Sequence, residues 1–267
     1  MVDAVVDIGN SRIKFCRCYA RGLVLPVRGL STNDPTAWDK LVAEWDLLPL
    51  PETERGEKSS RSRIWAVAST HPPRRTEFIS WAEARGDHVR VLDSTAKVPI
   101  GASVDEPGLV GIDRLLNALA AKSHLKQGQP AILVDAGSAV TVDLLDEHGN
   151  FAGGTIFPGL RLMALALREH TAQLPLVDLS AELPSGPPGK NTVAAMHLGI
   201  LHAVAGGIDA IIRELASRCT IAPTLFLTGG DMSPKLAGLM QSRYQFATEV
   251  RSTLTLEGIF LAASRVP

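Results

Sequence analysis

The sequence predicts an α/β protein made of two similar halves, each with a mixed sheet and flanking helices. Strand-like and helix-like patterns alternate along all 267 residues. Each half opens with consecutive strands before its first helix. An Asp-x-Gly pattern ends a strand twice, at Asp7 and at Asp135, about half the chain apart. A repeat of this length is too long for a solenoid and indicates two related lobes.

The first half begins with a strand, a glycine turn and a second strand. Val2, Ala4, Val5, Val6 and Ile8 are small or β-branched and Gly9-Asn10-Ser11 is a turn signal, so residues 2–19 predict a hairpin. Asn33 or Asp34 can cap a helix that has Pro35 at its first position. The remaining expected elements are a strand at 22–29, that helix to about residue 48, a strand at 64–68, a helix near 75–85, a strand near 88–92 and a helix at 111–126.

The second half repeats the opening pattern. Residues 132–135 resemble a buried strand and are followed by Ala136-Gly137-Ser138. The other expected elements are strands at 140–145 and 151–157, a helix after Pro158-Gly159, a loop at 175–191, a helix from 191 to about 218 weakened at Gly206-Gly207, a strand at 225–227, a helix, a strand near 244–249 and a helix at 252–264. The expected lobes are residues 1–115 and 116–267.

Composition excludes several classes of protein. The charge balance of 27 basic against 28 acidic residues argues against binding nucleic acid or an anionic membrane through bulk charge. The start of the chain lacks a basic segment, and no apolar run reaches the roughly 18–20 residues of a membrane helix. The three cysteines, Cys16, Cys18 and Cys219, form no C-x-x-C pair and are expected to be reduced thiols. These features predict a cytoplasmic protein.

The two Asp-x-Gly turns predict phosphate binding. A glycine turn between strands exposes backbone N–H groups and lets the main chain approach an anion closely. The aspartate reaches phosphate only through a cation or water, whereas the ammonium of Lys14 can contact it directly. One such turn is most often structural, but a pair facing each other across a cleft would clamp a polyphosphate. Competing phosphate motifs, G-x-x-x-x-G-K-[ST] and G-x-G-x-x-G, do not occur.

A third candidate is Gly111-Ile112-Asp113-Arg114 at the start of a predicted helix. One interpretation is a helix cap beside a surface cation. The functional interpretation makes Asp113 a general base for an alcohol that attacks the γ-phosphate, with Arg114 holding an anionic part of the acceptor. Phosphoryl transfer requires mainly positioning, charge neutralisation and one proton acceptor, which this pair could supply.

The chain resembles the type III pantothenate kinases of the actin-like (ribonuclease H-like) superfamily, because it carries six of their sequence motifs in the same order along the chain. The shared patterns are D-x-G-N-[TS]-x-x-K, G-x-D-R, D-x-G-[TS]-A-x-T, G-G-x-I-x-P-G, T-x-x-A-x-x-x-G and T-G-G. The matching residues are Asp7, Gly9, Asn10, Ser11 and Lys14; Gly111, Asp113 and Arg114; Asp135, Gly137, Ser138, Ala139 and Thr141; Gly153, Gly154, Ile156, Pro158 and Gly159; Thr192, Ala195 and Gly199; Thr228, Gly229 and Gly230.

The resemblance implies ATP-dependent phosphorylation of the primary hydroxyl of pantothenate to 4′-phosphopantothenate, which opens coenzyme A biosynthesis. It implies a homodimer whose interface helps form the pantothenate site, Mg²⁺ with ATP, and a monovalent cation, K⁺ or NH₄⁺, at Asp135. Asp113 would be the catalytic base. The implied ATP-binding residues are Asp7, Ile8, Gly9, Asn10, Ser11, Arg12, Ile13, Lys14 and Ser138, and the implied pantothenate-binding residues are Gly111, Ile112, Asp113, Arg114 and Thr192.

The sequence departs from the family pattern at a few positions. Ser11 and Ser138 stand where many members have threonine, and both keep a hydroxyl. Val104 stands where a tyrosine is common, so the acceptor pocket would lack an aromatic wall and a hydroxyl. Two alternatives therefore stay open: a kinase or phosphohydrolase of the same superfamily with another acceptor, and a nucleotide-sensing regulator without turnover. The Cys-rich zinc motif of repressor-related sugar kinases is absent.

Overall fold

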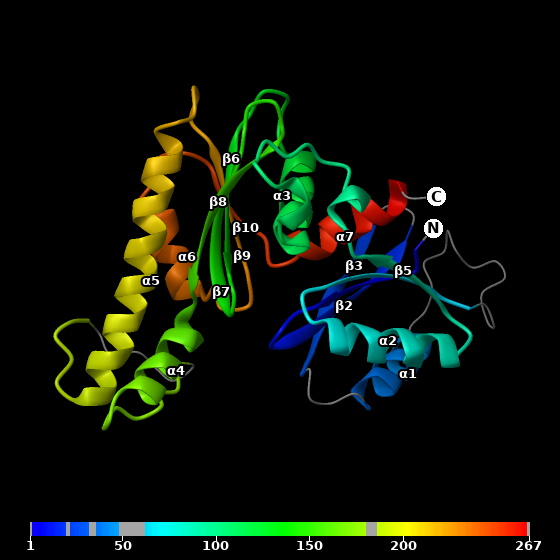
Figure 1. Ribbon diagram of the computed structural model, residues 1–267, viewed down its shortest axis with the longest axis horizontal. Helices are drawn as coiled ribbons and strands as arrows, with labels where there is room; N and C mark the ends of the chain where they lie inside the picture. The colour runs from blue at the N-terminus through cyan, green and yellow to red at the C-terminus, as the bar shows by residue number, and fades with distance from the viewer. Residues whose placement is uncertain (1, 20–21, 32–35, 48–61, 180–185, 266–267) are drawn as a thin grey trace. The chain divides into compact units, whose positions relative to one another are not determined.

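The computed structural model describes residues 2–19, 22–31, 36–47, 62–179 and 186–265 (Figure 1). The chain forms two compact units. The first comprises Met1–Pro99, Gly108–Leu119 and Thr255–Pro267, and the second comprises Ile100–Pro107 and Ala120–Leu254. The C-terminal helix therefore lies in unit 1, whereas the sequence interpretation assigned all of residues 116–267 to a second lobe.

Unit 1 contains a five-stranded sheet in the order β3-β2-β1-β4-β5. The first three strands are antiparallel neighbours, and β1 pairs in parallel with β4, as β4 does with β5. The strands are β1 (Ala4–Ile8), β2 (Arg12–Tyr19), β3 (Gly22–Ser31), β4 (Ile64–Ser69) and β5 (His88–Leu92); the helices are α1 (Ala37–Leu47), α2 (Pro72–Ala84), α7 (Leu254–Arg265) and the first part of α3 (Ile112–His124). Two short 3₁₀ turns, Thr95–Lys97 and Pro107–Leu109, precede α3.

Aromatic side chains fill one face of this sheet. Trp65 of β4 and Phe78 of α2 are fully buried, with ring centroids 5.5 Å apart and an edge-to-face arrangement. The indole N–H of Trp65 donates to buried Asp87 at 2.9 Å, so this donor keeps a hydrogen-bond partner although it is buried. Large apolar rings of this kind contribute much of the burial free energy of a small core. The hairpin that carries Asp7 is therefore built on a rigid base.

The packing of α7 against α3 fixes the start of α3. A side chain at Gly258 would come within 2.1 Å of the carbonyl oxygen of Leu116, so the two helices approach backbone to backbone. The hydroxyl of Thr255 donates to Asn117 at 2.8 Å, and both residues are buried. Unit 1 thus holds the turn of α3 that carries Asp113.

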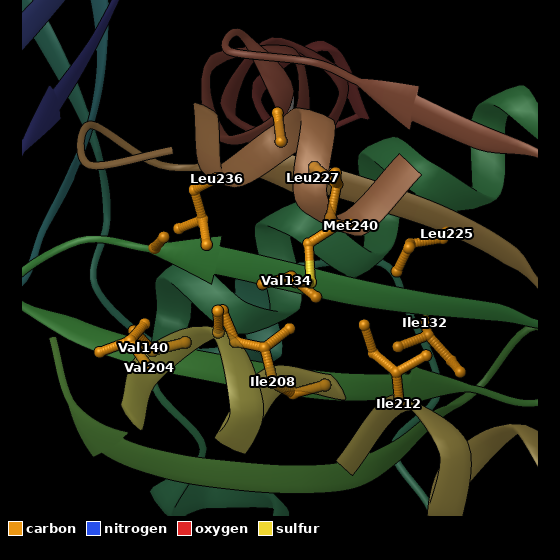
Figure 2. Packing of buried hydrophobic residues seen from close by; sticks show 14 residues of the cluster. Ile132, Val134, Val140, Val204, Ile208, Ile212, Leu225, Leu227, Leu236 and Met240 are labelled. Atoms are coloured by element: carbon orange, nitrogen blue, oxygen red, sulfur yellow. The ribbon is translucent and has the colours of Figure 1, made fainter. Parts of the chain in front are cut away.

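Unit 2 contains a second five-stranded sheet, in the order β10-β9-β6-β7-β8, with the same mixture of antiparallel and parallel pairs. Its strands are β6 (Ala131–Ala136), β7 (Ala139–Leu145), β8 (Phe151–Pro158), β9 (Thr224–Thr228) and β10 (Thr248–Val250), and its helices are α4 (Leu160–His170), α5 (Thr192–Ala216) and α6 (Pro234–Gln241). Figure 2 shows Val204, Ile208 and Ile212 of α5 packed against the β-branched residues of the sheet.

Helix α5 runs unbroken through Gly206-Gly207, where the sequence predicted a weak point. Its burial explains the difference, since Val204, Ala205 and Ile208 lie in the core around the two glycines. By length and composition alone α5 could cross a membrane, contrary to the expectation that no segment would, but half of its most apolar stretch is buried within the structure. A core helix has this character.

The predicted elements are found with small shifts of their ends. α2 begins at Pro72, because His71 caps it by accepting a hydrogen bond from the N–H of Arg74 at 3.2 Å. The last strand is shorter than predicted, and Tyr244 stacks on Phe246 just before it, with ring centroids 4.9 Å apart. The predicted helix cap at residues 33–35 lies outside the described residues.

Candidate active site

The first Asp-x-Gly turn joins β1 to β2 in unit 1. The N–H of Gly9 donates to the carbonyl oxygen of Arg12 at 3.0 Å, which closes the turn. Asp7 and Lys14 face each other across the strand pair, with Lys14 Nζ 3.9 Å from Asp7 Oδ2. Both side chains are largely shielded from solvent: that of Lys14 is 23% exposed and that of Asp7 is 17% exposed. The structure therefore brings together the carboxylate and the ammonium that the sequence singled out.

The other residues of this turn divide into two kinds. Asn10, Ser11 and Arg12 are exposed at the tip, where their polar groups can meet a ligand. Ile8 and Ile13 are fully buried in the core of unit 1. Their side chains anchor the hairpin, so only their main-chain atoms are available to a nucleotide.

The second Asp-x-Gly turn joins β6 to β7 in unit 2. The N–H of Gly137 donates to Ala139 O at 3.0 Å, which closes this turn one residue more tightly than the first. Gly159 packs against the turn from one side: its N–H donates to Ser138 O at 3.0 Å, and a side chain there would lie 2.1 Å from Gly137 O. The glycine that follows β8 therefore shapes the turn.

The T-G-G segment packs against the same turn. Gly229 has a φ of +107°, and a side chain there would lie 2.2 Å from Ala136 O. The N–H of Asp231 donates to that same carbonyl oxygen at 2.8 Å. Only glycine permits both the positive φ and the close approach. The support that Gly159 and Gly229 give this turn was not foreseen, although both lie in motifs that the sequence showed.

Two threonines flank Asp135 in the sheet of unit 2. Asp135 is in register with Thr141 on β7 and with Thr228 on β9, so the three side chains share one face. The hydroxyls of Thr141 and Thr228 are buried and have no hydrogen-bond partner among the described residues. Leaving a buried hydroxyl unpartnered costs about 1–3 kcal/mol. One carboxylate between two such hydroxyls is an oxygen donor set that fits a hard cation.

Asp113 lies in the first turn of α3, where the helix dipole favours a carboxylate. Its Oδ1 accepts from the N–H of Arg114 at 2.9 Å. A side chain at Gly111 would come within 2.7 Å of the same oxygen. The carboxylate therefore lies against the main chain, in the space that a side chain at residue 111 would take. The side chains of Ile112, Asp113 and Arg114 are all partly exposed, so they can contact an acceptor.

Val104 and Thr192 belong to unit 2. Val104 is half-buried over Gly153, with Cγ1 3.5 Å from the position that a side chain there would take. Thr192 is exposed at the start of α5, where Asn191 caps the helix. Figure 1 shows this end of α5 beside the last turn of α4, and helix α4, with 11 residues, is about 16 Å long. Within unit 2 the structure does not bring Thr192 to the second Asp-x-Gly turn.

Solved structures with the same fold cover nearly the whole chain. A putative 2-dehydro-3-deoxygalactonokinase from Sinorhizobium meliloti has a TM-score of 0.58 at 14% identity, covering 97% of each chain. A putative Baf family transcriptional activator from Campylobacter jejuni has a TM-score of 0.55 at 17% identity, covering 98% of this chain and 97% of the other. The dehydratase activator from Clostridium difficile with bound ADPNP has a TM-score of 0.52 at 13% identity, covering 99% and 95%. At this identity they confirm the actin-like fold alone.

Sequence relatives identify the family. A type III pantothenate kinase from Rhodopirellula baltica is 44% identical over 248 residues, covering 86% of this chain and 88% of the relative. One from Geobacillus kaustophilus is 36% identical over 176 residues, covering 65% of each. The family model for type III pantothenate kinases matches residues 4–214, a range that includes both Asp-x-Gly turns and Asp113. The chain therefore belongs to the type III pantothenate kinase family.

Proposed function

We propose that this protein transfers the γ-phosphoryl group of ATP to the primary hydroxyl of pantothenate, giving 4′-phosphopantothenate for coenzyme A biosynthesis. The observation that carries the proposal is the family match over residues 4–214. The local geometry supports it, because each unit presents a glycine-closed turn beside an aspartate, and α3 presents a held carboxylate.

The two turns are proposed to bind ATP. The exposed tip at Asn10-Ser11-Arg12, the ammonium of Lys14 and the Ser138 turn supply main-chain N–H groups, hydroxyls and positive charge for phosphate oxygens. Mg²⁺ accompanies ATP in kinases and neutralises charge on the phosphates. Asp7 reaches a metal-bound water more readily than a phosphate, because like charges repel.

Asp113 is proposed to accept the proton of the pantothenate hydroxyl as it attacks the γ-phosphorus. Its contact with Gly111 and the Arg114 N–H fixes where the carboxylate sits, and positioning is most of what phosphoryl transfer requires. The Arg114 guanidinium is proposed to pair with the pantothenate carboxylate. Gly111 and Ile112 would line the same acceptor site.

Asp135 is proposed to bind the monovalent cation, K⁺ or NH₄⁺. The two unpartnered threonine hydroxyls beside it support this assignment, because their buried oxygens are available to a ligand. A cation held there would supply positive charge next to the second turn. Ser138, three residues further on, would contact ATP.

A homodimer is proposed to complete the acceptor site. Thr192 lies at the end of α5 that is remote from the second turn, so it can serve a site only where another surface meets it. Leu176 and Val193, near this end of the α4–α5 pair, are exposed apolar side chains that a second copy could cover. We further expect the protein in the cytoplasm, with no nucleic-acid or membrane partner.

The test is an ADP-release assay coupled to a second enzyme, with pantothenate as acceptor and with or without K⁺. We expect ADP release that requires pantothenate, rises with K⁺ and yields 4′-phosphopantothenate by mass spectrometry. Hexoses and water serve as competing acceptors. ADP release with either of these alone would indicate another superfamily kinase or a phosphohydrolase, and nucleotide binding without any product would indicate a regulator.

A further inference from the structure

The two Asp-x-Gly aspartates have different neighbours in their sheets. In unit 1, Asp7 is in register with Lys14 on the antiparallel strand and with Ala68 on the parallel strand. In unit 2, Asp135 is in register with Thr141 and Thr228 at the corresponding places. A hydroxyl therefore takes the place of the lysine, and a second hydroxyl takes the place of a methyl group.

The two hydroxyls are buried without a hydrogen-bond partner among the described residues, so a bound ligand would satisfy them. Thr228 is 1% exposed, and neither its Oγ1 nor that of Thr141 has a hydrogen-bond partner within the described part of the chain. Neighbouring strands lie about 4.8 Å apart, so Thr141 and Thr228 stand one strand away from Asp135 on either side. The carboxylate and the two hydroxyls therefore lie side by side on three adjacent strands, on one face of the sheet.

The charge of this donor set favours a monovalent cation. Two neutral hydroxyls and one carboxylate carry a single negative charge, which one K⁺ neutralises. In unit 1 an ammonium from the chain itself, Lys14 Nζ, lies 3.9 Å from the aspartate. Thr141 is neutral, so a positive charge at the corresponding place in unit 2 would be that of a free ion.

We propose that Thr141 and Thr228 are ligands of the monovalent cation at Asp135, and that this cation stands in unit 2 where the Lys14 ammonium stands in unit 1. The inference rests on the proposed function only for the presence of a cation at Asp135. It adds the residues that select the ion and gives a reason why one turn needs an ion while the other contains its own cation.

The sheet supplies a matched control. Thr155 on β8 also has a buried hydroxyl without a partner among the described residues. It is in register with Val142, which lies in the core against α5 and α6, so Thr155 is on the opposite face from Asp135. Replacing Thr155 by valine removes a similar hydroxyl without touching the proposed cation site.

The experiment measures the thermal unfolding midpoint of the full chain without nucleotide, in KCl and in tetramethylammonium chloride of equal ionic strength. For the wild-type protein and Thr155→Val we expect a saturable rise with K⁺ of roughly 5 °C at a hundredfold excess over Kd. Thr141→Val and Thr228→Val should raise the K⁺ concentration at half-saturation at least tenfold. Thr141→Ser and Thr228→Ser keep the hydroxyl and should restore the wild-type value.

The Thr141→Lys variant gives the most direct test of whether a cation occupies this place. Its ammonium should take the place of the ion, so that K⁺ no longer shifts the midpoint and any remaining turnover no longer depends on K⁺. Equal K⁺ responses in Thr141→Val, Thr228→Val and Thr155→Val would overturn the inference, as would a response of the wild-type protein to Mg²⁺ but not to K⁺. These outcomes leave the proposed function standing if pantothenate is phosphorylated. Failure of that reaction in K⁺ would contradict the proposed function instead.

Discussion

The Asp113 carboxylate occupies the space beside Gly111 that a side chain would fill, with Oδ1 only 2.7 Å from the position of the missing Cβ. Gly111→Ala should therefore displace the proposed base. Because a misplacement of about 1 Å can lower a rate roughly a hundredfold, we expect kcat to fall by about 10- to 100-fold. Steady-state kinetics should show little change in the KM for ATP. Gly108→Ala, three residues earlier and with no atom near its Cβ position, should leave kcat unchanged.

Removing the base itself should have a larger effect. Asp113→Asn keeps the size of the side chain and its contact with the Arg114 N–H, but it cannot accept a proton. We expect turnover to fall by roughly 10²–10⁴ while ATP still binds. Single-turnover kinetics and nucleotide titration separate the two effects. Asp105→Asn, an exposed carboxylate before the same helix, serves as the control. Turnover of Asp113→Asn equal to that of the control would remove Asp113 from this role.

Lys14 should act mainly on ATP binding. It supplies positive charge next to Asp7 at the first turn, so Lys14→Met should raise the KM for ATP by about tenfold or more, which corresponds to about 1.4 kcal/mol. The difference from wild type should shrink in high salt, because salt screens a partly exposed charge. Arg17→Ala removes a cation further along β2 and is expected to leave the KM for ATP unchanged.

The contact between Gly159 and the second turn should couple stability to ATP binding. An alanine Cβ at Gly159 would lie 2.1 Å from Gly137 O, so the turn must shift. We expect a loss of about 1–3 kcal/mol in the free energy of unfolding, together with weaker nucleotide binding. Gly206→Ala in the middle of α5 has open space at its Cβ and should stabilise the protein by roughly 0.5–1 kcal/mol. Denaturant titration measures both variants.

The buried thiol of Cys16 should make stability fall in alkaline solution. Burial raises the pKa of Cys16 from 9.0 to about 11. Below about pH 9 both the folded and the unfolded chain keep the proton, so the thiol stabilises the folded state fully. Between about pH 9 and 11 the unfolded chain loses the proton first, so stability declines as pH rises. Thermal unfolding from pH 8 to 11 should show a shallower decline for Cys16→Ala. Parallel curves for the two proteins would contradict this assignment.

Local chemistry explains why much of the fold was predictable. The turn at Gly9-Asn10-Ser11 and the β-branched strands on either side carry their own signals, and the same holds for residues 132–145. The hairpin predicted at residues 2–19 is confirmed, and its turn sets the register that places Asp7 opposite Lys14. The continuity of α5 through Gly206-Gly207 was not predictable, since core packing outweighs the weak helix propensity of glycine.

The sequence by itself determined the two-lobed α/β class, the two Asp-x-Gly turns and the candidate base Asp113, because each depends on residues that are neighbours in the chain. Only the tertiary structure decided what surrounds those groups. Thr228 lies beside Asp135, and Gly159 and Gly229 pack against the second turn. These pairings and contacts join segments that are 22 to 93 residues apart along the chain. Strand pairing and close backbone packing create such neighbours, and no local pattern encodes them.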